Sequence, residues 1–183
     1  MALTIASELL TEPEPYQKIG FAYFVATFLF GTNSILGGFL TDLLGAKKVI
    51  FIYLLGSGIS LVLIGLSPNY FFLVISLGLL GFSIGLYHPP GNVLISIATK
   101  KTGRAMGIHG MGGSLGLALS PFLVSFLTEQ FTWRKGFILL GVFPIIFGSY
   151  ILADKNFIFK NFSPPQPPAL DYPNTKNYLT ISL

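Results

Sequence analysis

The chain has 183 residues, of which 52% are apolar and only 10% charged, and its net charge is +4. Soluble domains carry about 25% charged residues, so most of this chain cannot face water. The absence of cysteine excludes disulfides, cysteine-ligated metal centres and thiol redox switches. The lysines and arginines gather at the ends of apolar runs, which favours lipid headgroups rather than nucleic acid as their partner.

Five apolar runs are long enough to cross a hydrocarbon core, which takes about 20 helical residues. We expect transmembrane helices at residues 19–40, 49–66, 70–98, 105–127 and 136–153. The turns between them are short, so consecutive helices run antiparallel, and residues 1–153 form an all-α membrane bundle. Residues 154–183 carry five of the twelve prolines between Pro164 and Pro173, which is typical of an extended, disordered tail.

The positive charges indicate how the bundle is oriented. If the turn after the first predicted helix is cytoplasmic, seven cationic residues lie inside and three outside, as the positive-inside rule requires. The inner set is Lys47, Lys48, Lys100, Lys101, Arg104, Lys155 and Lys160, and the outer set is Lys18, Arg134 and Lys135. We therefore expect a multi-pass protein of the cell membrane, whose first partner is the lipid bilayer.

The turn at residues 38–50 reads G-F-L-T-D-L-L-G-A-K-K-V-I and resembles the signature loop of the major facilitator superfamily of transporters. The positions that fall on the family pattern are Gly38, Leu40, Asp42, Gly45 and Lys47. Leu43 and Ala46 depart from it, because the family usually carries arginines there. The resemblance implies one half of a major facilitator fold. It also implies a cytoplasmic gate at Gly38, Asp42, Gly45 and Lys47, in which the acid braces neighbouring helix ends and the opposite half.

An internal repeat relates two turns of the chain. F-L-T-D-L-L-G-A-K-K-V-I-F at residues 39–51 aligns with F-L-T-E-Q-F-T-W-R-K-G-F-I at residues 126–138, an offset of 87. The predicted topology places these turns on opposite sides of the membrane, which indicates an inverted repeat unless the similarity is chance. At this offset the third predicted helix has no full counterpart, so we expect the chain to hold helices two to six of a six-helix half.

His88 is the outstanding residue inside a predicted helix, in the sequence G-L-Y-H-P-P-G-N. Pro89 and Pro90 lack backbone N–H groups, so we expect the helix to break here, near mid-membrane. Transporters use such breaks to bind substrates or ions, and histidine is the side chain that exchanges protons near neutral pH. Tyr87, His88 and Asn92 are therefore the candidates for a substrate or proton path. The alternative is a neutral histidine that only plugs the break.

The same stretch, H-P-P-G-N-V-L-I-S, and the glycine-rich helix after it are similar to the fosmidomycin-resistance branch of the superfamily. In that helix Gly112 and Gly116 share one face and predict close helix packing ahead of Pro121. Gly116 and Pro121 also match an antiporter pattern of the family, although packing alone explains them. His109 is expected at the cytoplasmic interface, near Arg104.

The resemblance implies part of a secondary transporter that moves a small solute, driven by protons. It implies further partners too, either missing helices or a second transporter half. The alternative is a non-transporting membrane assembly partner or a remnant of a transporter. An enzyme is not expected, because Asp42 and Glu129 lie at opposite predicted faces and no catalytic groups cluster. Nothing in the sequence indicates a metal site or a cofactor.

Overall fold

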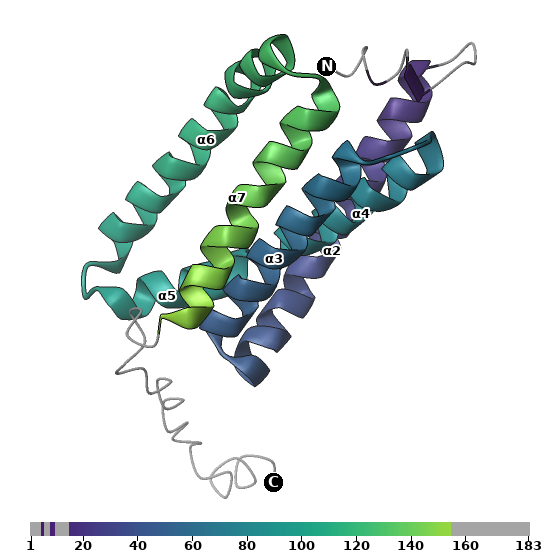
Figure 1. Cartoon of the computed structure of the whole chain (residues 1–183). Coiled ribbons are helices and arrows are strands. Elements are labelled where there is room, and N and C mark those ends of the chain that lie inside the picture. Colours follow the sequence, from purple (N-terminus) through teal and green to yellow (C-terminus); the bar gives the residue numbers. More distant parts are fainter. Residues whose placement is uncertain (1–4, 6–7, 10–14, 155–183) are drawn as a thin grey trace, which may run out of the picture.

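The computed structural model describes Ile5, Glu8, Leu9 and residues 15–154, and the regular elements of that part are all helices (Figure 1). They are α2 (Pro15–Leu44), α3 (Ala46–Gly65), α4 (Tyr70–Gly85), α5 (His88–Ala98), α6 (Thr102–Gln130) and α7 (Trp133–Ala153). In the described residues five spans are long and apolar enough to cross a membrane, with α4 and α5 sharing one of them. The predicted all-α membrane bundle is confirmed. The predicted tail, beyond Asp154, lies outside the described residues.

The turn between α2 and α3 is much tighter than the sequence suggested. Helix α2 continues to Leu44, and Gly45 alone separates it from α3. Gly45 has a φ of 83°, in the left-handed region that a side chain disfavours. Its N–H donates to the carbonyl of Thr41 at 2.9 Å, which closes the end of α2. A glycine is therefore needed at this position for the reversal of the chain.

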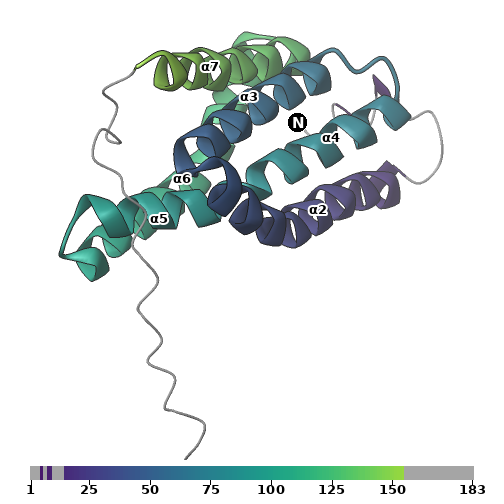
Figure 2. The ribbon, with the colours of Figure 1, turned by 90° about the horizontal axis from the view of Figure 1, so that it is seen from below.

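Four helices lie side by side in the order α7, α3, α4 and α2 (Figure 2). Helices α3 and α7 approach each other closely where Gly58 and Gly141 face each other. A Cβ atom built on either glycine would lie 2.6 Å from the carbonyl oxygen of the other. Small residues of this kind let two helix backbones pack tightly where lipid provides no hydrophobic driving force between them.

Helices α3 and α7 are also tied at both ends, and the two ties are equivalent under the internal repeat. At one end Lys47 Nζ donates to the carbonyl of Asp154 at 2.6 Å. At the other end Arg134 Nη1 donates to the carbonyl of Ser67 at 2.5 Å. Arg134 is 87 residues after Lys47, and Asp154 is 87 residues after Ser67. Both partners follow the same offset at opposite ends of an antiparallel pair, as the predicted inverted repeat requires.

Helix α6 stands apart from this row and contacts α5 and α7 (Figure 1). Nearly all of its residues from 110 to 126 are exposed. Among the described atoms, a Cβ built on Gly112 or Gly116 would have no neighbour within 4 Å. The packing role of these glycines and of Pro121 therefore stays a prediction, and the described residues supply no partner for that face.

The contrast between the two glycine sets can be measured. Gly141→Ala should lower the unfolding temperature of the purified chain, because the added methyl overpacks the α3–α7 contact, at a typical cost of about 1–3 kcal/mol. Gly116→Ala should be neutral or slightly stabilising, since alanine is the better helix former. Equal tolerance of both changes would contradict the close α3–α7 packing. A lower unfolding temperature in Gly116→Ala would instead show that α6 packs against a partner.

Candidate functional site

The third span breaks just ahead of its two prolines. Helix α4 ends at Gly85 and α5 begins at His88, and Leu86 and Tyr87 between them belong to neither helix. Pro89 and Pro90 therefore lie in the first turn of α5, where a missing N–H has no helical acceptor to lose. The expected break beside the prolines is therefore present, just ahead of them. Pro89 and Pro90 begin the new helix and deprive the preceding carbonyls of donors.

The break is held against α2 by a close backbone contact and one hydrogen bond. A Cβ built on Gly37 would lie 3.1 Å from the Leu86 carbonyl oxygen, so α2 passes directly beside the non-helical backbone. One turn earlier the buried Asn33 donates its amide to the Phe82 carbonyl at 2.6 Å. These contacts fix the break relative to α2, so its side chains have defined neighbours.

Rings from four helices and the break itself meet around Tyr87. Its ring centroid lies 5.0 Å from that of Tyr53 on α3, 5.9 Å from that of His88 and 5.8 Å from that of His109 on α6. His88 in turn contacts Phe30 of α2 edge-on at 5.6 Å. We call Phe30, Tyr53, Tyr87, His88 and His109 the ring cluster. Both histidines of the chain belong to it.

The ring cluster lies closer to the Asp42 end of the bundle than expected. Helix α4 has 16 residues and so spans about 24 Å before the break, most of a hydrocarbon core of about 30 Å. Tyr53 likewise lies only two turns into α3. The expected mid-membrane break is therefore displaced toward the Asp42 side. The displacement also explains why His109, which the sequence predicts at the cytoplasmic interface, contacts Tyr87.

The three predicted path residues lie near one another but differ in exposure. Tyr87 is half-buried, whereas His88 and Asn92 are exposed on α5. They are four residues apart in one helix and thus share a face. Tyr87 also packs against Gly91, where an added Cβ would lie 3.2 Å from the phenol ring. The arrangement brings two imidazoles and two phenols into ring contact, and all four groups donate and accept hydrogen bonds.

The predicted gate residues form a separate site at the α2–α3 turn. Gly38 is half-buried, Asp42 is exposed at the end of α2, and Gly45 forms the turn. Lys47 reaches the end of α7 through the bond to Asp154 described above. The structure does not bring this motif into contact with His88. In the described residues no three His, Cys, Asp or Glu side chains cluster as a metal site would require.

Sequence reasoning missed Asn33, Tyr53 and Phe30, and it placed His109 without a partner. Asn33 carried a signal, because an amide within an apolar membrane span usually bonds to a neighbouring helix. Tyr53 and Phe30 carried none, since aromatic residues are common on lipid-facing and buried faces alike. Only the packing of α2, α3 and α6 around the break selects them.

A family model of the Major Facilitator Superfamily matches residues 1–173. The chain belongs to the Major Facilitator Superfamily. It is thus a multi-pass membrane protein of transporter type, and the large apolar side chains exposed on its helices contact the bilayer.

Several curated members of the family are similar to this chain. The multidrug resistance protein MdtG of Proteus mirabilis is 31% identical over 144 residues, 77% of this chain and 35% of its own length. The probable sulfoacetate transporter SauU of Cupriavidus necator is 27% identical, over 76% of this chain and 33% of its own. The probable nitrate transporter NarT of Staphylococcus epidermidis is 32% identical, over 65% and 31%. The chain thus spans about a third of the length of these relatives.

The bond from Asn33 to Phe82 should contribute measurably to stability. Asn33→Leu should lower the unfolding free energy by about 1 kcal/mol, within the range of interhelical hydrogen bonds in membranes. Thr32→Val is the matched control, because the Thr32 hydroxyl bonds to Phe28 in its own helix and is exposed. Thermal unfolding in detergent gives both values. An Asn33→Leu chain as stable as Thr32→Val would show that the bond does not hold the break.

Proposed function

We propose that the chain is part of a proton-coupled secondary transporter of the major facilitator type, with its substrate or proton path at the ring cluster. The observation that carries this proposal is the convergence of His88 and His109 on Tyr87, beside a helix break. A proton taken up by either imidazole changes the charge next to the path. Such a change is what couples proton movement to solute movement.

The break supports the proposal through its backbone. The carbonyls of Gly85 and Leu86 lack the usual helical donors, because residues 89 and 90 are prolines. Carbonyls of this kind coordinate solutes or ions in transporters with interrupted helices. Asn92 is exposed on the same face of α5 as His88, and its side-chain amide both donates and accepts hydrogen bonds.

The solute we propose is a small molecule, and the relatives suggest where to begin. SauU is named for sulfoacetate and NarT for nitrate, which are both small anions, whereas MdtG is named for drugs. Protonated histidines suit an anion. The likeness of H-P-P-G-N to the fosmidomycin-resistance branch remains part of the proposal, as does placement in the cell membrane.

Alternating access needs two helical bundles that rock about a central site. We therefore propose that this chain acts with further helices, which complete the walls of the path. In that assembly Gly38, Asp42, Gly45 and Lys47 would act as the cytoplasmic gate. The tie from Lys47 to the α7 end then keeps the gate turn fixed to its own half.

The role of His88 can be tested in the complete transporter. His88→Ala should abolish solute-driven proton movement, or shift its pH dependence, while membrane insertion stays normal. The measurement is the internal pH of proteoliposomes after addition of sulfoacetate, nitrate or drugs.

Ser96→Ala is the matched control on α5, because the Ser96 hydroxyl bonds only to a carbonyl of its own helix among the contacts described. It should leave transport unchanged. Normal transport per folded molecule in His88→Ala would overturn the proposed role. A loss of folding in His88→Ala without a change in transport per molecule would identify a structural plug.

The proposed orientation makes a separate prediction. The chain has no cysteine, so an introduced one carries the only thiol. Leu43 and Phe131 are exposed at opposite ends of the bundle. Leu43→Cys should react with an impermeant maleimide only from the cytoplasm, and Phe131→Cys only from outside. Labelling of both from one side would rule out the inverted arrangement.

A further inference from the structure

The basic residues at the two ends of the α3–α7 pair, Lys47 and Arg134, differ in the number of contacts they make. Among the described residues Lys47 bonds to one carbonyl, that of Asp154. Arg134 bonds to the carbonyls of both Ser67 and Gly65, at 2.5 and 3.4 Å. Its guanidinium also lies 4.4 Å from the centre of the Trp133 ring, within cation–π range. The Arg134 end is therefore the more extensively bonded of the two.

A carboxylate from far away in the sequence completes this end. One oxygen of Glu8 accepts a bond from Arg134 Nε at 2.9 Å, and the other accepts from the Trp133 indole at 2.5 Å. Trp133 is only 3% exposed, so its N–H needs an acceptor inside the protein. Glu8 therefore links the N-terminal segment to α7 and, through Arg134, to the end of α3.

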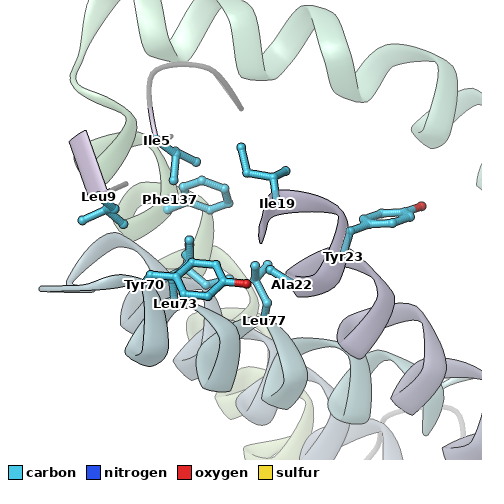
Figure 3. Close-up of a pocket in the computed structure, with 10 residues that line it drawn as sticks. Ile5, Leu9, Ile19, Ala22, Tyr23, Tyr70, Leu73, Leu77 and Phe137 are labelled. Carbon is cyan, nitrogen blue, oxygen red and sulfur yellow. The ribbon is translucent and has the colours of Figure 1, made fainter. Parts of the chain in front are cut away.

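Ile5 and Leu9, near Glu8 in the chain, line an apolar cavity. Ile5 and Leu9 lie three residues before and one residue after Glu8, and both line a cavity of about 220 Å³. Figure 3 shows Ile5 next to Phe137 and Leu9 near Tyr70. The other walls come from α2, α3 and α4: Ile19, Ala22, Tyr23, Ile64, Leu73 and Leu77. Ile5 and Leu9 also pack against the buried cluster of Ile64, Leu73 and Trp133.

We propose that Glu8, bonded to Trp133 and Arg134, holds the side chains of Ile5 and Leu9 as a releasable cover over this cavity. The apolar contacts of Ile5 and Leu9 are non-directional, whereas the two hydrogen bonds of Glu8 fix one position. Loss of the Glu8 charge removes the ion pair and weakens both bonds, so the cover opens and the cavity becomes accessible.

The charges around Glu8 set the direction of its pH dependence. The bonds from Trp133 and Arg134 lower the pKa of Glu8 from its ordinary value of 4.5. A carboxyl group with a lowered pKa stabilises the closed form above that ordinary value, and this contribution is lost as the pH falls through the lowered pKa. Arg134 is the cation that bonds to Glu8, and the end of α3 presents the carbonyls of Gly65 and Ser67 to the same guanidinium.

The single tryptophan of the chain reports on this cover directly. In the purified full chain at pH 7, Glu8→Gln should shift the Trp133 emission to longer wavelength and raise its quenching by acrylamide. Glu8→Asp keeps the charge, so its Trp133 emission wavelength and its acrylamide quenching should lie between those of Glu8→Gln and wild type. A second readout is the labelling rate of Leu9→Cys, the only thiol present, which should rise when Glu8→Gln is added.

Glu129→Gln is the matched control, because this exposed carboxylate lies at the same end and bonds to Ser125 of its own helix. It should leave the Trp133 emission and the Leu9→Cys labelling unchanged. Acidification below pH 4.5, through the lowered pKa of Glu8, should shift the wild-type emission toward that of Glu8→Gln and leave Glu8→Gln unchanged. Identical quenching and labelling in wild type and Glu8→Gln at pH 7, with both chains folded, would overturn the proposal.

Discussion

Two adjacent prolines impose the constraint from which the candidate site follows. Inside a bilayer every backbone polar group needs a partner within the protein, so a span that lacks two donors cannot continue as one helix without compensation. Here α4 stops and α5 begins anew at His88. The bent backbone then needs a neighbour without side-chain bulk, which Gly37 of α2 provides. The ring cluster forms around Tyr87 because that residue lies in the break itself.

The α3–α7 pair is held together by close packing and by hydrogen bonds at both ends. Its helices touch through Gly58 and Gly141, and a basic residue at the start of each helix bonds to carbonyls at the end of the other. This reciprocity has a physical basis, because the carbonyl end of a helix carries partial negative charge and favours a cation. The same bond from a basic residue to a helix-end carbonyl occurs at both ends of the pair, related by the inverted repeat, and stabilises each of them. In the described part of the chain, Glu8 adds a further attachment at the Arg134 end.

The sequence predicted the class of fold well because the relevant signals are local. Apolar length defines the five spans, Gly45 predicts the turn, and the 87-residue offset predicts the relation between Lys47 and Arg134. The position of the break was predicted less well, since proline can either end a helix or begin one, and the outcome depends on the residues before it. The ring cluster could not be predicted, because Tyr53, Phe30 and His109 come together only through helix packing.

The central claim is that Tyr87, His88 and His109 form one site rather than three independent side chains. The chain contains only these two histidines, so selective isotope labelling of histidine gives two imidazole signals in NMR spectra of the purified protein. Because both imidazoles contact the Tyr87 ring, we predict that the chemical shifts of the two signals depend on this shared neighbour. In a Tyr87→Leu chain both signals should shift, and in a His88→Gln chain the His109 signal should move. Signals that keep their positions in both variants would contradict the account.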